Sequence, residues 1–343
     1  MSFFIDETNL FSSIDLFSSI DLFKVKPDYQ ARDEIETKIS TILPYKHTIN
    51  VEGSSIKVEL FHSDVTDEQL AKIETVINDT FKVCQKYVSI LNDKDVNFRM
   101  FLFEDREQYV DMKKSLYASD TTDQEAGVTI PNPDPFSLSL SIDNPSFKND
   151  FPNYLKSPSD VLIYAKDNFS NYSKSFEEID YHTLAHEFVH CIQRIVTQFN
   201  KADLSKSVTE GSANLIACEA LHEEKMCKML EDFGSCKIKS HDLNLGDVYY
   251  AKNPMVNEDP YSTGMAMFKF LGEKHPEIVT DISKYFMLGD NIKWHDIFNK
   301  IWYIDNKNPE EFKEWIESQD VQYTKCDSSM DIIHALTSLV DIL

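Results

Sequence analysis

The sequence predicts an α+β fold, with a mixed β-sheet and helices in the N-terminal half and mostly helices in the C-terminal half. Three observations lead to this prediction. The 343 residues are 42% hydrophobic, which is enough for a sizeable core in one large or two modest domains. Segments with strand patterning occur only before Ser175. Nearly every later segment has the apolar spacing of a helix.

The first half is expected to mix strands and helices. Residues 48–62, TINVEGSSIKVELFH, read as two short strands around a Gly-Ser turn. Residues 66–92 carry apolar side chains at helical spacing, among them Ile73 and Phe81, and predict a long amphipathic helix. Short or alternating apolar runs predict further strands, and REQYVDMKKSLY predicts a second helix. These are strands at 96–105, 127–130, 136–143 and 161–165, and a helix at 106–117.

The second half is expected to be almost entirely helical. Its first helix begins at Ser175–Glu178, which has the S-x-x-E form of a capping box. Leu184, Phe188 and Ile192 then form an apolar stripe along that helix. The expected helices are 176–197, 209–231, 260–274, 276–287, 308–319 and 328–342.

The chain divides into three parts on these patterns. Residues 1–30 are an N-terminal extension, residues 31–197 a sheet-containing subdomain and residues 198–343 a helical subdomain. Within the extension, residues 10–23 read LFSSIDLFSSIDLF, so the unit LFSSID occurs twice. A short duplication in a terminal extension needs no function, and a docking segment or an export signal is the alternative interpretation.

Composition argues against two classes of partner. The formal net charge is −24 and the pI is near 4.7, so the protein should repel nucleic acid phosphates and anionic membranes. No apolar run approaches the roughly 18 residues that a membrane-spanning helix needs. We therefore expect no nucleic-acid partner and no stable membrane association.

We expect the protein to be cytoplasmic, or secreted by a route without a cleaved signal peptide. The N-terminal residues MSFFIDETNL contain no basic region, no long apolar segment and no small-residue cleavage site. The 6 cysteines include no CxxC pair, and we interpret them as reduced, buried thiols. Both observations fit these two locations.

The segment HEFVH, at residues 186–190, is typical of half a zinc site. A helix places His186 and His190 on one face, because they are four residues apart, and their imidazoles can then bind one ion. Glu187 would lie beside that ion, where it can take a proton from a water molecule. Chance is a poor explanation, since an accidental HExxH is expected in roughly two of a hundred chains of this composition.

A catalytic zinc site needs a third protein ligand, for which Glu210 is the candidate. A third histidine six residues after His190 is excluded, because Val196 occupies that position. Glu210 lies 20 residues after His190 on the next expected helix, which leaves room for the chain to reverse. The alternative is that Glu210 only complements a helix N-terminus, or closes a capping box with Ser207.

These residues carry a family resemblance. HExxH followed at this distance by Glu-Gly-x-Ala is similar to the gluzincin metallopeptidases, and most similar to the peptidase domain of bacterial collagenases. The segment DPYSTGMAMFKFLGEKHPEIV, at 259–279, resembles that group in the order and spacing of its Tyr-Gly and His-Pro-Glu elements. The resemblance spans about residues 45–300. It implies a thermolysin-like fold with the active site between the two subdomains.

The resemblance implies a role for each site residue. His186, His190 and Glu210 would bind Zn²⁺, and Glu187 would act as the general base. Tyr261 would donate a hydrogen bond to the oxyanion of the tetrahedral intermediate.

The chain also departs from the pattern of this family. The position four residues after Glu210 usually holds an acidic residue that orients a zinc histidine, and here it is Asn214. An amide oxygen also accepts an N–H, but it adds less basicity than a carboxylate. The double-glycine edge strand of the collagenase group is missing, and AGVTI at 126–130 takes its place. Tyr249 and Tyr250 are alternatives to Tyr261.

The predicted function is therefore a zinc-dependent endopeptidase that hydrolyses a protein or peptide substrate, with Glu187 activating the attacking water. An extended substrate would pair with an edge strand of the sheet. One alternative is a secreted effector-type protease specific for one host protein, which the LFSSID repeat suggests. Another is a non-catalytic zinc-containing binding module, which the intact Glu187 disfavours because such a module needs no base.

Overall fold

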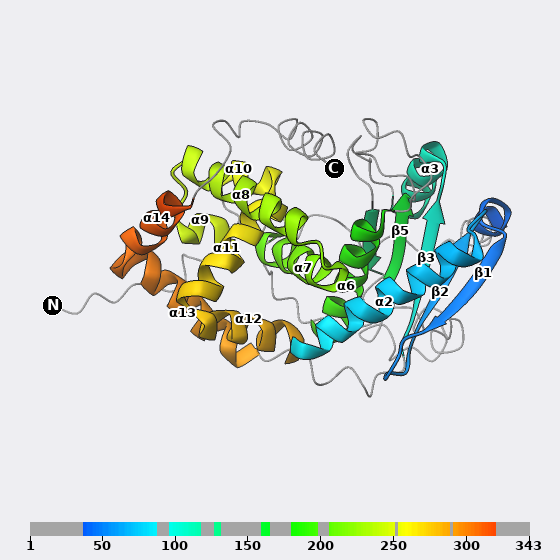
Figure 1. Cartoon of the computed structure of the whole chain (residues 1–343), viewed down its shortest axis with the longest axis horizontal. Coiled ribbons are helices and arrows are strands. Elements are labelled where there is room, and N and C mark those ends of the chain that lie inside the picture. Colours follow the sequence, from blue (N-terminus) through cyan, green and yellow to red (C-terminus); the bar gives the residue numbers. More distant parts are fainter. Residues whose placement is uncertain are drawn as a thin grey trace, which may run out of the picture. The chain divides into compact units, whose positions relative to one another are not determined.

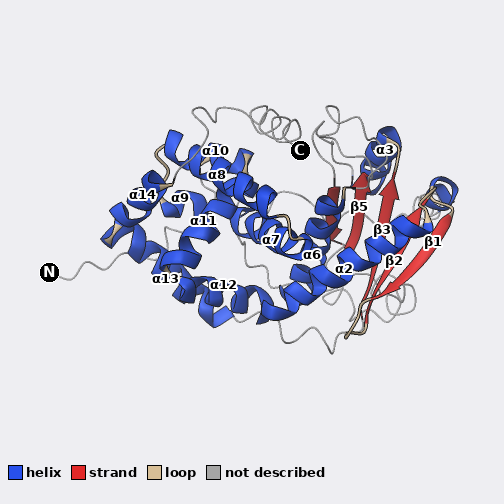
Figure 2. Cartoon of the chain, viewed as in Figure 1, coloured by secondary structure: helices blue, strands red, loops and turns tan. Residues whose placement is uncertain are grey.

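Strands and helices occupy different parts of this protein, as expected for an α+β fold (Figure 2). The structure, a computed structural model, describes residues 37–87, 96–117, 127–131, 159–164, 180–197, 206–250, 253–288 and 291–319. Residues Ile42–Leu343 form one compact unit, and Met1–Thr41 form a separate one.

Several sequence predictions fall outside the described residues. These are the extension at 1–30 with its repeat, the strand at 136–143, the helix at 328–342 and the capping box at Ser175–Glu178. The proposed subdomain boundary between residues 197 and 198 also lies at the edge of an undescribed stretch.

The described strands form one mixed sheet in the order β1-β2-β3-β5-β4. Strands β1 (Tyr45–Asn50) and β2 (Ile56–His62) are an antiparallel hairpin. Strands β3 (Val96–Phe103) and β5 (Ser159–Tyr164) extend the sheet in parallel. Strand β4 (Gly127–Pro131) pairs antiparallel with β5 and is an edge of the sheet. The strands predicted in this part of the chain are confirmed, with small shifts at their ends.

Helices make up the rest of the described chain (Figure 1). They are α2 (Asp67–Tyr87), α3 (Arg106–Tyr117), α6 (Tyr181–Thr197), α7 (Lys206–Leu221), α8 (Glu224–Ser240), α9 (Leu245–Tyr250), α10 (Pro254–Glu258), α11 (Pro260–Lys274), α12 (Pro276–Leu288), α13 (Asn291–Lys307) and α14 (Pro309–Ser318). The predicted helices at 260–274, 276–287 and 308–319 correspond to α11, α12 and α14. In the part of the chain that is described, no helix has the length and apolarity needed to cross a membrane.

The single helix predicted at 209–231 is wrong, because the chain reverses between α7 and α8. His222 adopts a left-handed conformation with a φ of 55°. The backbone N–H of Glu223 donates to the carbonyl of Cys218 at 3.0 Å, which satisfies the open end of α7. Neither glycine nor proline marks this reversal, so the sequence contained no ordinary turn signal.

Helix α6 is packed between the sheet and the other helices. It contacts β4 and β5 and also α2 and α7. Leu184, Phe188 and Ile192 are fully buried, which confirms the predicted apolar stripe. Phe188 packs edge-to-face on Phe98 of β3, with ring centroids 6.3 Å apart. This packing holds the helix that carries HEFVH firmly against the sheet.

Helices α7 and α11 meet at two glycines. A Cβ atom added to Gly264 would lie 2.1 Å from the carbonyl oxygen of Ser207 and 2.9 Å from the Cα of Gly211. Both neighbours are backbone atoms, so no side chain can move aside to make room. This contact sets the position of Glu210, which precedes Gly211, relative to α11.

Gly264→Ala is expected to destabilise the protein by about 2 kcal/mol, because overpacking against backbone outweighs the better helix propensity of alanine. Gly272→Ala is the matched control, since it lies on the same helix and its Cβ would meet nothing within 4 Å. We expect the control to gain about 0.5–1 kcal/mol. Urea unfolding of both variants measures the difference, and equal responses would contradict the close contact.

The cysteines only partly follow the prediction of reduced, buried thiols. Cys84, Cys191 and Cys218 are free and buried, and Cys227 is free and partly exposed. Cys236 is disulfide-bonded, so the prediction is wrong for this residue. Disulfide pairing depends on which cysteines the fold brings together, and spacing along the chain does not reveal it.

Candidate metal centre

Helix α6 begins one residue after Asp180, whose carboxylate caps it. Asp180 Oδ1 accepts from the backbone N–H of Thr183 at 2.9 Å, and Oδ2 accepts from the Thr183 hydroxyl at 2.6 Å. The cap defines where the helix starts, and the helix then presents residues 186, 187 and 190 within one turn.

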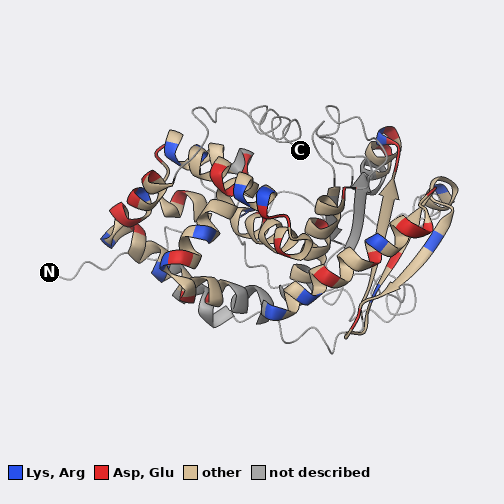
Figure 3. Ribbon diagram, viewed as in Figure 1, with Lys and Arg blue, Asp and Glu red and all other residues tan. Residues whose placement is uncertain are grey.

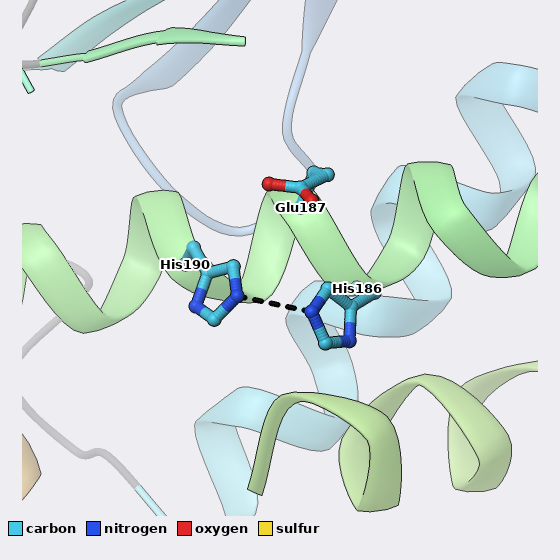
Figure 4. Close-up of side chains that lie close together, drawn as sticks. All are labelled: His186, Glu187 and His190. Atoms are coloured by element: carbon cyan, nitrogen blue, oxygen red, sulfur yellow. Dashed lines mark hydrogen bonds between the residues drawn. The ribbon is translucent and has the colours of Figure 1, made fainter. Parts of the chain in front are cut away.

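His186 and His190 face each other on this helix (Figure 4). Their Nε2 atoms are 3.0 Å apart, and their rings are almost perpendicular, at 88°. His186 is 6% exposed and Glu187 is 7% exposed. Ligand atoms of His186, Glu187 and His190 lie within 4.8 Å of one another, and this group could hold a metal ion.

One carboxylate oxygen of Glu210 lies within hydrogen-bond distance of both histidines. Its Oε2 is 3.1 Å from His186 Nε2 and 3.0 Å from His190 Nε2. With the Nε2–Nε2 separation of 3.0 Å, the three atoms form a nearly equilateral triangle. Neighbouring ligand atoms in a tetrahedral zinc site with bonds of about 2.0–2.1 Å are separated by roughly 3.3 Å. The triangle therefore has nearly the size of one face of a zinc coordination sphere.

Two carboxylates thus approach the histidine pair, and they do so in different ways. Glu210 is within 3.1 Å of both Nε2 atoms, whereas Glu187 lies within 4.8 Å of the group. Glu210 comes from α7 and completes the triangle, and Glu187 comes from the same helix as the histidines and lies beside it.

The far ring nitrogen of each histidine is held by a side-chain amide. Asn214 Oδ1 accepts from His186 Nδ1 at 2.7 Å, and Gln193 Oε1 accepts from His190 Nδ1 at 2.8 Å. An Nδ1–H donor leaves the lone pair on Nε2, which is the form that binds a metal. The sequence pointed to Asn214 but not to Gln193, which lies three residues after His190 on the same helix.

The Gln193 amide is itself fixed in orientation. Its Nε2 donates to the carbonyl of Thr209 at 3.2 Å and to the hydroxyl of Ser212 at 3.0 Å. Because the nitrogen faces these two acceptors on α7, the oxygen must face His190. A glutamine three residues after the second histidine of HEFVH is therefore a local signal for this hydrogen bond.

Glu210 and His190 each shift the pKa of the other. Burial by itself lowers the pKa of His190, but the charge and hydrogen bond of Glu210 outweigh burial and raise it to about 9. Burial by itself raises the pKa of Glu210, but the two histidines hold it well below its usual range. Glu210 and His190 thus each favour the charged form of the other.

Helix α6, which carries the two histidines, has few charged residues. Residues of both signs are spread along α2, α8 and α14 (Figure 3). Helix α6, by contrast, carries only Glu187 and Arg194 among Asp, Glu, Lys and Arg. A buried carboxylate in such surroundings interacts more strongly with a nearby cation than it would in water.

Tyr261 lies next to the histidines at the start of α11. Its ring centroid is 5.7 Å from that of His186, and the side chain is 45% exposed. Asp259 caps α11 by accepting from the backbone N–H of Ser262 at 3.1 Å. Of the two alternatives, Tyr249 is buried in the core and packs edge-to-face on Tyr250.

The edge strand β4 begins beside Glu187. A Cβ atom on Gly127 would lie 2.9 Å from Glu187 Cγ and 2.6 Å from Thr183 Cγ2. A glycine at this position lets the edge strand approach α6 closely, and a larger residue would displace the Glu187 side chain. The segment expected to replace the double-glycine strand is thus the edge strand next to the site.

The residues that the sequence singled out come together in one place. His186, Glu187, His190, Glu210, Asn214 and Tyr261 are joined by the contacts described above. Neither protein-family models nor curated protein sequences match this chain. The function must therefore be inferred from the chemistry of the site.

Proposed function

We propose that this protein is a zinc-dependent endopeptidase with a thermolysin-like, gluzincin arrangement of its active site. The observation that carries the proposal is the triangle of His186 Nε2, His190 Nε2 and Glu210 Oε2, with all separations between 3.0 and 3.1 Å. Two imidazoles and one carboxylate from three positions are the donor set of a catalytic zinc site with one open position. The sheet followed by helices α6 and α7 is consistent with this arrangement.

The three donor atoms suit zinc and would leave one coordination position open for a water molecule or a substrate. Amide oxygens of Asn214 and Gln193 keep both histidines in the metal-binding tautomer. Bound there, zinc would acidify a water molecule and polarise the carbonyl of a peptide bond. A structural zinc site would instead be closed by four protein ligands, and the described residues supply three at this distance.

Glu187 is the proposed general base. Its carboxylate lies within 4.8 Å of the histidine ligand atoms and is not part of the triangle, so it would face a water at the open position. It would take a proton from that water and then pass the proton to the leaving amine. Its burial, with 7% exposure, keeps competing bulk water away from this transfer.

Substrate binding is assigned to β4 and Tyr261. Strand β4 is at the edge of the sheet that the described strands form, and an extended peptide could pair with it. Such pairing would bring a scissile bond next to Glu187, since Gly127 packs against that residue. The exposed Tyr261 hydroxyl would donate to the carbonyl oxygen as negative charge develops there. An open edge strand favours internal peptide bonds, and the sequence has no GxMEN-type motif that would anchor a free amine.

Zinc content and new protein N-termini test this proposal together. The purified chain should bind one zinc ion and generate new N-termini in protein lysates. Chelator treatment should abolish this activity, and added Zn²⁺ should restore it. Full zinc loading without hydrolysis in any lysate or peptide library would overturn the proposal and favour the zinc-containing binding module. Cleavage restricted to a single protein would favour the effector-type alternative.

A further inference from the structure

His182 connects helix α6 to the reversal between α7 and α8. It lies one turn before His186, and its side chain is only 17% exposed. Its Nδ1 is 2.7 Å from Glu223 Oε2, and its Nε2 is 3.4 Å from Asn214 Oδ1. These contacts link His182 to the site.

Glu223 is available for this contact because it does not cap its own helix. It occupies the N-cap position of α8, but its side chain makes no capping hydrogen bond there. The carboxylate turns instead toward His182 and is 34% exposed. Glu223 therefore forms an ion pair with His182 of α6 and does not cap α8.

Asn214 Oδ1 contacts two histidines. It accepts from His186 Nδ1 at 2.7 Å, and His182 Nε2 approaches the same oxygen at 3.4 Å. A side-chain amide turned by 180° has nearly the same shape but presents its nitrogen instead. That nitrogen would donate to His186 Nδ1 and move the ring proton to Nε2, which would remove the lone pair that faces Glu210 and His190.

The Glu223 carboxylate favours a His182 ring that is protonated on both nitrogens. Burial by itself lowers the pKa of His182, but the hydrogen bond and charge of Glu223 raise it, with a smaller contribution from Asp180. A doubly protonated ring donates from Nδ1 to Glu223 and from Nε2 to Asn214. A donor at that position requires the amide oxygen, not the amide nitrogen, to face it.

We propose that the Glu223–His182 pair fixes the orientation of the Asn214 amide and thereby holds His186 in the tautomer that can bind a metal, an inference that rests on the metal site proposed above. His182 and Glu223 are positioning residues, since they act through Asn214. At the position that usually holds an acidic residue, a neutral amide contacts His186, and the Glu223–His182 ion pair holds this amide in place. The Glu223 carboxylate is the third side chain from His186, after Asn214 and His182.

Zinc affinity of three variants tests this role. His182→Leu and Glu223→Gln should weaken Zn²⁺ binding by about 10–100-fold in competition with a chromophoric chelator, as loss of an outer partner does. His182→Gln should restore most of the affinity, because a glutamine Nε2 can donate to Asn214 from a similar position. Glu219→Gln is the control, since this glutamate pairs with Lys86 on the surface.

A second measurement separates positioning from stability and from the proposed function. Ring ¹⁵N shifts in the metal-free protein should show His186 protonated on Nδ1 in the wild type, and a mixture of tautomers in His182→Leu and Glu223→Gln. Lower melting temperatures with unchanged zinc affinity and unchanged tautomer would overturn the positioning role. A wild type that binds no zinc would overturn the proposed function, and the tautomer measurement would still decide the role of the pair.

Discussion

Glu187→Gln is expected to abolish peptide hydrolysis while zinc remains bound. The substitution keeps the size of the side chain but removes the carboxylate that would accept a proton from the attacking water. Loss of a general base typically costs about 10²–10⁴-fold in rate. Zinc binding should survive, because Glu187 lies outside the triangle of donor atoms that His186, His190 and Glu210 form.

The measurement is kcat on a cleaved substrate together with the zinc content of the same preparation. Glu107→Gln, an exposed glutamate in the first turn of α3, is the matched control and should retain full activity. Activity of Glu187→Gln close to that of the wild type, in a chelator-controlled assay, would refute the assignment of Glu187 as the base.

Glu210→Gln is expected to weaken zinc binding by more than the roughly 10–100-fold cost of losing an outer hydrogen-bond partner. The carboxylate oxygen is within 3.1 Å of both histidine nitrogens, so its charge and its lone pair are both directed at the ion position. A neutral amide in its place has the same shape but lacks the negative charge, and one of its two terminal atoms is a donor that cannot bind the ion. Hydrolysis should fall together with the zinc content.

The thermal shift on adding zinc distinguishes this role from a merely structural one. A ligand that binds only the folded state raises its stability, so wild type should gain stability with excess Zn²⁺ and Glu210→Gln should not. If Glu210 served only to complement the N-terminal end of α7, the variant would lose about 0.3–1 kcal/mol and keep the zinc-dependent gain. Ser207→Ala serves as the control for a capping role.

Local patterns were enough to find the half of the site that lies on one helix. His186, Glu187 and His190 belong to one turn, and their relative positions follow from helix geometry once the segment is helical. The apolar residues that bury this helix recur at the same period, so the face that carries the histidines could be expected as well. Gln193 lies on the same helix, three residues after His190, and its contact with His190 follows from the same geometry.

Long-range contacts decided the other half. Spacing made Glu210 the candidate ligand and left a capping role with Ser207 as the alternative, and the packing of α6 against α7 brings Glu210 to the histidines. The choice of Tyr261 over Tyr249 likewise depended on which side chain is exposed next to His186. Exposure of a side chain and its neighbours from other segments depend on how the segments pack together. The periodicity of one segment does not predict this packing.

The reversal at His222 and Glu223 illustrates the same limit. Helical periodicity runs through this stretch, and the sequence therefore predicted a continuous helix, whereas a left-handed residue breaks it. That break is what brings Glu223 to His182, 41 residues earlier in the chain. The sequence by itself determined the α+β class, the HEFVH helix and a short set of further candidates, because these depend on local periodicity and spacing. Only the tertiary structure decided which of these candidates lie together, because this depends on how closely the helices approach one another. Gly211 of α7 and Gly264 of α11 allow such a close approach.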